Sequence, residues 1–344
     1  MVINHMRISN FLVFRDDESP SFNESFCEGI NVFIGANGTG KSTLLKCIHA
    51  ACEYSRPKEN NISLLKYFSS NNAFLDTEPG FYRIQSGCNE FFCNFVSGYG
   101  RGGYGLGAYG GLTYEGTPLN DNDPWRTMNI NSILIPSSEM LSHSPGFLAL
   151  NYKYKIPFDQ TQIDILANAQ LPETREISDR DHNILKSLSD IIDGDVLYEN
   201  DTFYLAKRNG LKVEFSLEAE GLRRLGLLWK LIRNGLLPSG SVLLWDEPES
   251  SLNPELIPAL VKALYKLMQS GVQIFIATHN YFLAKYIEVL NTDSEKLLYL
   301  LLYKDNTQHI GVICSKTYAN ISNNPIEAAE EKLYQAILQK AMEN

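Results

Sequence analysis

Three short apolar runs in the chain have the length and composition of buried β-strands. Apolar side chains alternate along residues 29–34, whereas residues 241–245 and 273–278 are almost continuously apolar. A short continuous apolar run is typical of a parallel strand that is covered on both faces. The pattern therefore predicts an α/β fold in which these runs are central strands of one sheet.

Apolar side chains recur at helical spacing in segments that follow or precede these runs. One helix is predicted over residues 254–270, with Asn253 as its N-cap and Gly271 at its end. A second is predicted over residues 222–234. Its apolar stripe consists of Leu222, Leu225, Trp229 and Ile232. A third begins near residue 42, and its apolar positions are Leu44, Leu45, Ile48 and Cys52.

Weaker patterns occupy the rest of the chain. Residues 81–84 and 90–95 predict a β-hairpin, and residues 137–200 read as mostly helical. Residues 325–342 predict a C-terminal helix, which we expect to pack against its own domain. The apolar face of that helix carries Leu333, Ile337 and Leu338.

Residues 98–116 are exceptional in composition, with nine glycines and a tyrosine at every fifth position. Their first six residues formally match the G-x-G-x-x-G pattern of dinucleotide-binding proteins, but no helix follows and the glycines simply continue. A flexible surface loop is the favoured interpretation. The alternative is that the tyrosines stack on nucleic-acid bases or dock a partner.

The first run leads directly into the sequence Gly-Ala-Asn-Gly-Thr-Gly-Lys-Ser, which matches G-x-x-x-x-G-K-S between a strand and a helix. Glycines let successive N–H groups point at phosphate oxygens, and the following helix adds its positive N-terminal end. Lys41 supplies a charge for the outer phosphates, and the Ser42 hydroxyl is a ligand for Mg²⁺. The predicted nucleotide-binding residues are Gly35, Ala36, Asn37, Gly38, Thr39, Gly40, Lys41, Ser42 and Thr43.

Carboxylates follow the second apolar run, and a histidine follows the third. Ligands bind at the carboxyl ends of strands in such sheets. Asp246 is therefore expected to hold Mg²⁺, and Glu247 to orient or deprotonate the attacking water. His279 is expected to hydrogen-bond the γ-phosphate, so we predict Glu247 and His279 as the catalytic residues.

Composition limits the function classes. The 344 residues carry a net charge of −10, whereas a dedicated nucleic-acid-binding domain is usually basic. No apolar run is long enough to span a membrane, and the first residues show no export signal. The six cysteines form no C-x-x-C pair, so a reducing cytoplasm fits them best.

These motifs together resemble the ABC-ATPase superfamily, and the opening residues 6–11 look like the first strand of its SMC- and RecF-type heads. The resemblance rests on the phosphate loop, on Asp-Glu-Pro-Glu at 246–249, on Ser-Leu-Asn-Pro at 251–254, and on Thr278-His279. It implies ATP and Mg²⁺ as cofactors and a homodimer closed around ATP. It also implies a signature segment, for which residues 216–221 are the candidate, with Glu220 and Gly221 contacting the nucleotide of the opposite subunit.

The resemblance further implies a lid glutamine after the strand at 131–136, where Glu139 stands as a substitute. The long interval between Lys41 and Gly221 is typical of SMC-like heads and of OLD-like, Septu-type and retron-associated antiviral ATPases. We therefore expect an ATPase that controls a separate effector, a nuclease being favoured. One alternative is a peripheral transporter subunit. The other is a RecF-like DNA clamp with a basic surface at Arg223, Arg224, Lys230 and Arg233.

The expected fold is an ABC-ATPase head with a P-loop core sheet, an antiparallel β part and a helical insertion. Residues 1–55 and 211–320 would form the discontinuous core. Residues 56–136 would be a β and loop insertion, residues 137–210 a mostly helical insertion, and residues 321–344 a C-terminal helix.

Overall fold

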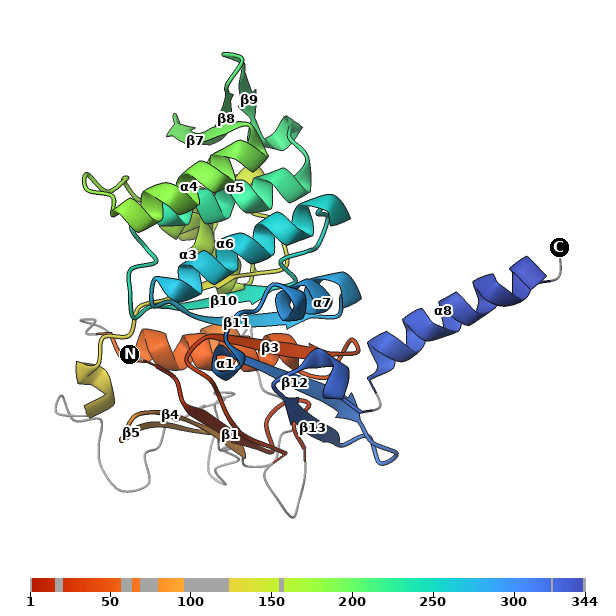
Figure 1. Ribbon diagram of the computed structural model, residues 1–344. Helices are drawn as coiled ribbons and strands as arrows, with labels where there is room; N and C mark the ends of the chain where they lie inside the picture. The colour runs from red at the N-terminus through yellow and green to blue at the C-terminus, as the bar shows by residue number, and fades with distance from the viewer. Residues whose placement is uncertain are drawn as a thin grey trace.

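A computed structural model describes residues 2–15, 21–56, 64–68, 80–95, 124–154, 158–322 and 324–342. Its centre is a six-stranded sheet in the order β13-β12-β3-β11-β10-β6 (Figure 1). All neighbouring pairs are parallel except β12 and β13. The strands are β3 (Ile30–Gly35), β6 (Ser132–Ile135), β10 (Val242–Asp246), β11 (Gln273–Thr278), β12 (Leu297–Lys304) and β13 (Ile310–Ser315). The three apolar runs are thus confirmed as adjacent central strands.

The main sheet is buried on both faces, and its strands alternate between two apolar clusters. On β10, Leu243 and Trp245 belong to one cluster, while Val242 and Leu244 belong to the other. The first cluster joins the sheet to a layer of helices, and the second joins it to α1 (Lys41–Tyr54) and a second sheet. Burial on both faces explains why these strands are continuously apolar.

The second sheet is antiparallel, in the order β2-β1-β4-β5. Its strands are β1 (His5–Ser9), β2 (Phe22–Ser25), β4 (Gly80–Ser86) and β5 (Asn89–Phe95). The last two form the predicted hairpin, which pairs with β1 through β4. The antiparallel part of the predicted fold is therefore confirmed.

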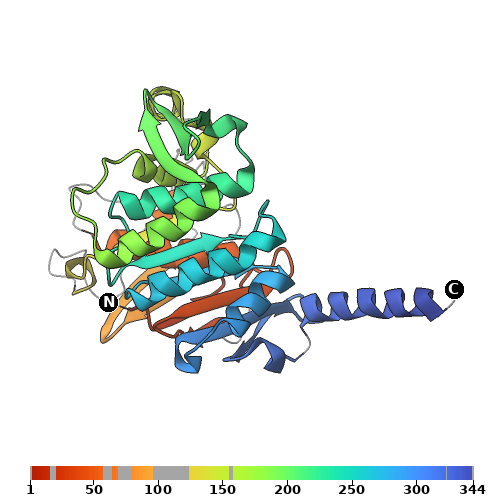
Figure 2. The same cartoon turned by 45° about the horizontal axis from the view of Figure 1, so that its top comes forward.

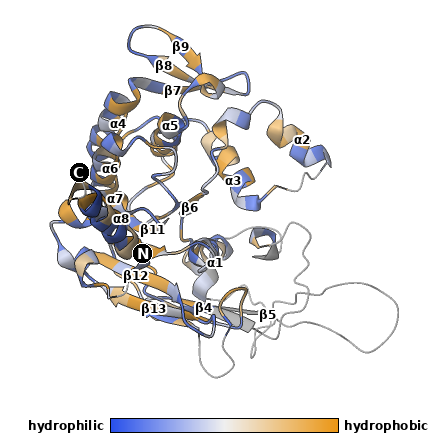
Figure 3. Ribbon diagram, turned by 90° about the vertical axis from the view of Figure 1, so that its right-hand side faces the viewer, coloured by the Kyte–Doolittle hydropathy of each residue, from blue (hydrophilic) through white to orange (hydrophobic). Residues whose placement is uncertain are grey.

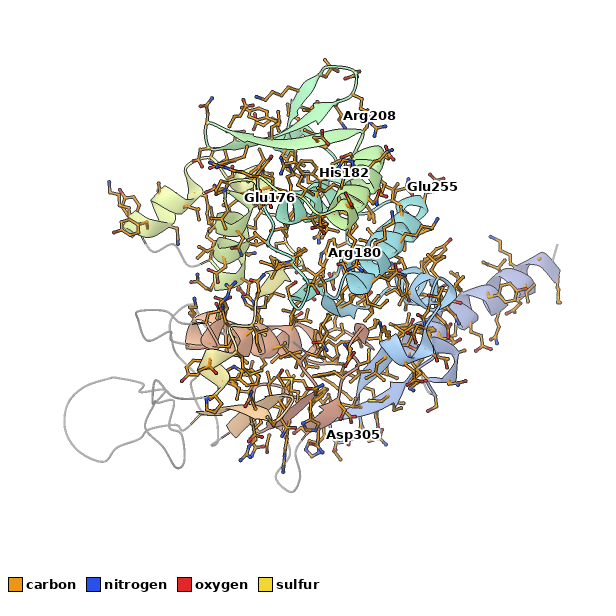
Figure 4. The ribbon with its side chains drawn as sticks, turned by 60° about the vertical axis from the view of Figure 1, so that its left-hand side comes forward. Glu176, Arg180, His182, Arg208, Glu255 and Asp305 are labelled. Carbon is orange, nitrogen blue, oxygen red and sulfur yellow. The ribbon has the colours of Figure 1, made fainter. Side chains whose placement is uncertain are left out.

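The opposite face of the main sheet carries the helical layer, capped by a third sheet (Figures 1 and 3). Its helices are α2 (Phe147–Tyr154), α3 (Gln160–Ala169), α4 (Asp179–Ile192), α5 (Glu220–Arg233), α6 (Ile257–Gln269) and α7 (Tyr281–Val289). The third sheet consists of β7 (Gly194–Glu199), β8 (Thr202–Lys207) and β9 (Lys212–Glu214). Arg208, after β8, and Asp305, after β12, lie at opposite ends of the molecule (Figure 4).

The division of the chain into a core and two insertions stays a proposal. Strand pairing crosses its proposed boundaries, because β4 of segment 56–136 pairs with β1 and β6 of the same segment pairs with β10. Likewise β9 pairs with β8 across residue 210. The glycine- and tyrosine-rich residues 98–116 lie outside the described residues.

The C-terminal helix α8 (Pro325–Met342) forms as predicted, but the expectation that it packs against its own domain is wrong. It extends away from the body of the molecule, and none of its residues is buried (Figures 1 and 2). Among the described helices, none is long and apolar enough to cross a membrane.

Candidate nucleotide-binding site

The strand register brings the predicted site residues to one end of the main sheet. Asp246 pairs with Ala277 between β10 and β11, and Thr278 pairs with Ile34 between β11 and β3. Because the three strands are parallel, the segments that follow them leave the sheet together. This carboxyl end of β3, β10 and β11, with its following loops, is called the nucleotide end below.

The phosphate loop connects β3 to α1 and is shaped by glycine. Gly40 precedes α1 with a φ of 94°, in the left-handed region, and a Cβ there would come within 2.6 Å of the Phe14 ring. The Lys41 amine lies within the loop and donates to the carbonyls of Gly35, at 2.8 Å, and Ala36, at 2.9 Å. A lysine held this close to loop carbonyls and to a helix N-terminus is placed to meet phosphate oxygens.

Burial lowers the pKa of Lys41, and the carboxylates of Asp246, Glu247 and Glu249 oppose that shift. Three acidic groups around one lysine form a site of negative charge beside the phosphate loop. Such a site attracts a cation, and a phosphate chain enters it more readily with its metal than without. The electrostatics therefore fit a metal–nucleotide complex.

The two predicted metal ligands touch each other. The Ser42 hydroxyl donates to Asp246 Oδ2 at 2.7 Å, which joins the first turn of α1 to the end of β10. Burial raises the pKa of Asp246, while Ser42 and Lys41 act to lower it. A hydroxyl and a carboxylate are oxygen donors of the kind that Mg²⁺ prefers, so this pair fits that ion. In the part of the chain that the structure describes, no three His, Cys, Asp or Glu side chains form a group that could hold a metal ion by themselves.

Glu247 and His279 also meet at the nucleotide end. The Nδ1 atom of His279 lies 2.9 Å from Glu247 Oε1. Glu247 has a φ of 50°, which is unusual for a residue with a side chain, and its N–H donates to the carbonyl of Ala277 at 2.8 Å. Backbone held in this region is found where a structure fixes the direction of a functional side chain. The turn aims the Glu247 carboxylate at the residue that follows β11.

A buried contact behind this pair was not predicted from the sequence. The Thr278 hydroxyl donates to Glu249 Oε1 at 2.5 Å, and both residues are buried. The same hydroxyl accepts the N–H of Asn280 at 2.9 Å. Glu249 is the last residue of the Asp-Glu-Pro-Glu motif at 246–249, but nothing in the local sequence identifies Thr278 as its partner. The contact links the loop after β10 to the end of β11 and so supports Glu247 and His279.

A pocket of about 280 Å³ opens beside the metal ligands. Its wall includes Ser42 and Asp246, together with Lys46 of α1 and Gln162 of α3. Lys46 forms an ion pair with Asp159, the N-cap of α3, and thereby fixes the helical layer to the phosphate-loop helix. The sequence analysis missed these residues because Lys46 lies on α1 beyond the phosphate-loop motif, and the segment of Asp159 and Gln162 carries no motif.

Family models match most of the chain. Residues 111–285 match the family described as an AAA domain, putative AbiEii toxin, of a type IV toxin–antitoxin system. This match covers half of the chain. The chain belongs to this AAA-domain family. A second AAA-domain model matches residues 5–132. No curated protein matches the chain by sequence.

Solved structures agree with this AAA-domain assignment at the level of the fold. The Smc head domain from Pyrococcus furiosus, bound to the C-terminal domain of ScpA, has a TM-score of 0.53 at 11% identity, covering 97% of this chain and 99% of that one. Another Smc head, bound to the C-terminal winged-helix domain of ScpA, has a TM-score of 0.50 at 10% identity and covers 92% and 98% of the two chains. This AAA-domain protein therefore has the ABC/SMC head fold.

In this AAA-domain protein the candidate signature segment lies against the turn that carries Glu247. Gly221 approaches the loop after β10 so closely that a Cβ would come within 2.6 Å of the Ser251 carbonyl. Arg224, one turn further along α5, donates to the Glu247 carbonyl at 3.3 Å and lies 3.5 Å from Glu220. Arg224 thus connects helix α5 to the Glu247 turn of its own chain, a role that the sequence analysis did not assign to it.

Glu139, the substitute suggested for the lid glutamine, has other partners. Its side chain is buried, accepts the N–H groups of Leu141 and Ser142, and lies 3.3 Å from Arg223 of α5. It is not among the residues that line the pocket beside Ser42, whereas Gln162 is. These contacts favour Gln162 over Glu139 as the side chain that faces a nucleotide.

The four basic residues suggested as a DNA-binding surface are engaged inside the AAA-domain protein. Lys230 lies 2.7 Å and Arg233 3.0 Å from Glu173. Arg223 and Arg224 have the contacts just described, and the Arg224 side chain is only 3% exposed. The apolar stripe predicted for this helix also underestimates its burial, because every residue of α5 from Arg224 to Ile232 is buried. These residues therefore do not support a basic DNA-binding surface.

Proposed function

We propose that this protein binds ATP with Mg²⁺ and hydrolyses it at sites shared between two copies of the chain. The observation that carries the proposal is the convergence at the nucleotide end: the Ser42–Asp246 contact at 2.7 Å lies beside Lys41, and the Glu247–His279 contact at 2.9 Å follows the adjacent strand ends. Phosphoryl transfer requires these parts, namely a phosphate cradle, metal ligands and a group that orients water.

Each residue has a distinct role in this proposal. Lys41 and the loop N–H groups hold the β- and γ-phosphates, and Ser42 and Asp246 hold the ion. When bound, Mg²⁺ neutralises charge that develops on the phosphate oxygens. Glu247 accepts a proton from the attacking water, and His279, within hydrogen-bonding distance of the Glu247 carboxylate, fixes its direction and contacts the γ-phosphate.

We propose Gln162 as the lid glutamine of this site. It reaches the pocket from α3, and the Lys46–Asp159 ion pair fixes the start of that helix. An amide in this position donates to a phosphate or positions the water without adding charge. Gln162→Ala is expected to reduce ATP turnover about tenfold, a typical contribution of one positioning group. Unchanged turnover would contradict the assignment.

The homodimer follows from the resemblance to ABC-type heads. Glu220 and Gly221 stand at the start of α5, and in such heads the signature segment contacts the nucleotide of the facing subunit. The Arg224 contact then couples the occupant of one site to the Glu247 turn of the subunit that presents the signature. ATP binding would close the dimer, and hydrolysis would open it.

We further propose that this cycle controls a separate effector in antiviral defence, a nuclease being favoured, and that the protein acts in the cytoplasm. The description of the family as a putative AbiEii toxin of a toxin–antitoxin system supports a defensive role. Mixing the purified protein with the product of a neighbouring nuclease gene tests this step. A complex whose nuclease activity does not respond to ATP would count against it.

The principal test uses Glu247→Gln, with Glu255→Gln as its matched control. Glu255 is exposed at the start of the segment that leads into α6 (Figure 4). Glu247→Gln should bind ATP–Mg²⁺ yet release phosphate about 100-fold more slowly or worse, because it lacks the base. Light scattering with ATP–Mg²⁺ should show this variant accumulating as a closed dimer.

Two results would contradict the proposal. Wild-type turnover in Glu247→Gln would refute the role of the base. Bound ATP without any change in mass or hydrodynamic radius would refute the shared site, and the nucleotide would then have a structural role.

A further inference from the structure

Helix α3 carries Gln162 to the pocket beside the metal ligands, and its N-cap Asp159 is held by Lys46 of α1. A second contact attaches the same helix further along. The hydroxyl of Tyr67 donates to Asp164 Oδ2 at 3.2 Å, although the two residues are 97 positions apart in the sequence. Gln162 therefore lies between two points at which α3 is joined to distant parts of the chain.

The two contacts act on different sides of α3. At about 100° per residue, the side chains of Asp159 and Asp164 point about 140° apart around the helix axis. One contact alone would allow α3 to rotate about that point, whereas two contacts on different sides fix its rotation. The rotation of α3 decides where the amide of Gln162 lies in the pocket, so both contacts bear on the nucleotide end.

Tyr67 is itself fixed by α1 and β6. Its side chain is buried, and its ring packs edge-on against His49 of α1, with ring centroids 5.2 Å apart. The His49 Nδ1 atom lies 3.0 Å from the hydroxyl oxygen of Ser132 on β6. Burial lowers the pKa of His49 to about 4, so this ring is neutral at physiological pH. Burial also raises the pKa of Tyr67, so its hydroxyl keeps the proton that it donates.

The supports of α3 follow one side of the phosphate-loop helix. Ser42, Lys46 and His49 stand at positions i, i+4 and i+7 of α1, a spacing that places them on one face. This face carries in order a proposed metal ligand, the partner of the α3 N-cap and the support of Tyr67. The phosphate loop and α3 are thus connected through side chains of a single helix face.

We propose that Tyr67 is a positioning residue of the nucleotide pocket, whose hydrogen bond to Asp164 sets the orientation of α3 and thereby of Gln162. The proposal rests on the proposed function and on Gln162 as the lid glutamine. Tyr67 itself lies outside the wall of the pocket. Its removal should therefore slow the chemical step without weakening the binding of ATP.

The first test is Tyr67→Phe, which removes the hydroxyl and keeps the ring against His49. ATP turnover at saturation should fall about fivefold, while KM changes by less than about twofold, because the phosphate loop and the metal ligands are untouched. Tyr265→Phe is the matched control. Tyr265 is also buried, and its hydroxyl donates to the Ile287 carbonyl at 2.6 Å, between α6 and α7. The control should lose thermal stability as Tyr67→Phe does, yet keep its turnover.

The second test connects Tyr67 to Gln162 by combined variants. If Tyr67 acts through Gln162, Tyr67→Phe should cause less than about a twofold further loss of turnover when residue 162 is already alanine. Asp164→Asn is the conservative variant on the other side of the contact. Its amide keeps an oxygen that accepts from Tyr67, so at least about half of the turnover should remain, whereas Asp164→Ala should slow turnover as Tyr67→Phe does.

Hydrogen exchange of the nucleotide-free protein gives a readout that does not depend on ATP hydrolysis. The backbone N–H groups of residues 160–170 should exchange faster in Tyr67→Phe than in Tyr265→Phe, because α3 loses one of its two attachments. Exchange in this segment that does not respond to Tyr67→Phe would overturn the proposal.

Three kinetic results would also overturn it. One is wild-type turnover in Tyr67→Phe beside slowed turnover in Gln162→Ala, which would leave the proposed ATPase intact. The others are equal losses of turnover in Tyr67→Phe and Tyr265→Phe, and fully additive losses in the combination of Tyr67→Phe with Gln162→Ala. A wild type that binds ATP without hydrolysing it would refute the proposed function instead, and hydrogen exchange would then decide alone whether Tyr67 holds α3.

Discussion

The nucleotide end of the main sheet and helix α5 both carry charged side chains, but their positions are determined in different ways. At the nucleotide end, the functional residues stand at or shortly after the ends of adjacent strands, as Asp246 ends β10, Glu247 follows it and His279 follows β11. Strand pairing then brings these positions together automatically. On α5, the basic residues reach partners on distant segments, such as Glu139 before α2 and Glu173 before α4.

This difference matters for function as well as for prediction. At the nucleotide end, Ser42 and His279 are exposed and Glu247 is partly exposed, whereas the α5 residues are engaged in ion pairs and hydrogen bonds. Their charge therefore serves to fix α5 against the Glu247 turn and the helical layer. The nucleotide end presents polar groups to a ligand, whereas α5 connects the Glu247 turn to the helical layer.

The largest effect is expected from Lys41→Ala, which removes the charge at the centre of the nucleotide end. ATP affinity should fall at least about 100-fold, because the phosphates lose a charged hydrogen-bond donor that no neighbour replaces. Fluorescent-nucleotide titration measures the loss. Lys262→Ala, at an exposed position on α6, is the control and should bind as the wild type does. If both variants bound ATP equally, the phosphate loop would not be the binding element.

The nucleotide end was largely predictable because its chemistry is encoded locally. The apolar run, the glycine loop and the helical stripe around Lys41 each specify one element, and together they specify where the lysine sits. The pocket wall was not predictable in this way. Lys46 and Asp159 are 113 residues apart, and neither segment has a pattern that names the other as partner.

Helix α8 shows a second limit of sequence reasoning. The apolar stripe predicted the helix correctly, but an amphipathic pattern states only that one face avoids water. It does not state whether the cover comes from the same domain or from another chain. The expectation of packing within the domain failed for that reason, although Leu333 and Ile337 were correctly placed on one face.

A smaller effect is expected from Arg224→Ala, which tests the coupling role of α5. The free energy of unfolding should fall by about 2 kcal/mol, because the Glu247 carbonyl loses a buried donor and the side chain leaves a cavity. Turnover should fall with it, since the turn that aims Glu247 is released. Chemical denaturation and phosphate release are the measurements.

Two further variants separate packing from the hydrogen bond. Arg224→Met fills most of the space, so it should recover part of the stability but none of the turnover. Arg208→Ala is the exposed counterpart, because Arg208 pairs with Asp190 on the surface of the third sheet and its removal should change neither quantity (Figure 4). Equal effects of Arg224→Ala and Arg208→Ala would contradict the difference between buried and exposed arginines.

The smallest effect concerns pH and the buried carboxyl of Glu249. Burial raises its pKa above the ordinary value of 4.5, although Thr278 donates to it. Below pH 4.5 the group is protonated in folded and unfolded chains alike. As the pH rises, the unfolded chain ionises first, so the stability contributed by the neutral buried group is lost as the pH passes the raised pKa of the folded state.

Glu249→Gln removes this titration while keeping an oxygen that accepts from Thr278. The melting temperature of the nucleotide-free variant should therefore rise relative to that of the wild type as the pH increases from 4.5 through the raised pKa of the folded state. Thermal unfolding at several pH values measures the difference, and Glu255→Gln should show no such trend because its side chain is exposed. A constant difference between Glu249→Gln and the wild type at every pH would mean that burial does not raise the pKa of the Glu249 carboxyl. The group would then be ionised in the folded protein as readily as in the unfolded chain. The negative charge beside Lys41 would then be a stable part of the nucleotide end before any ligand arrives.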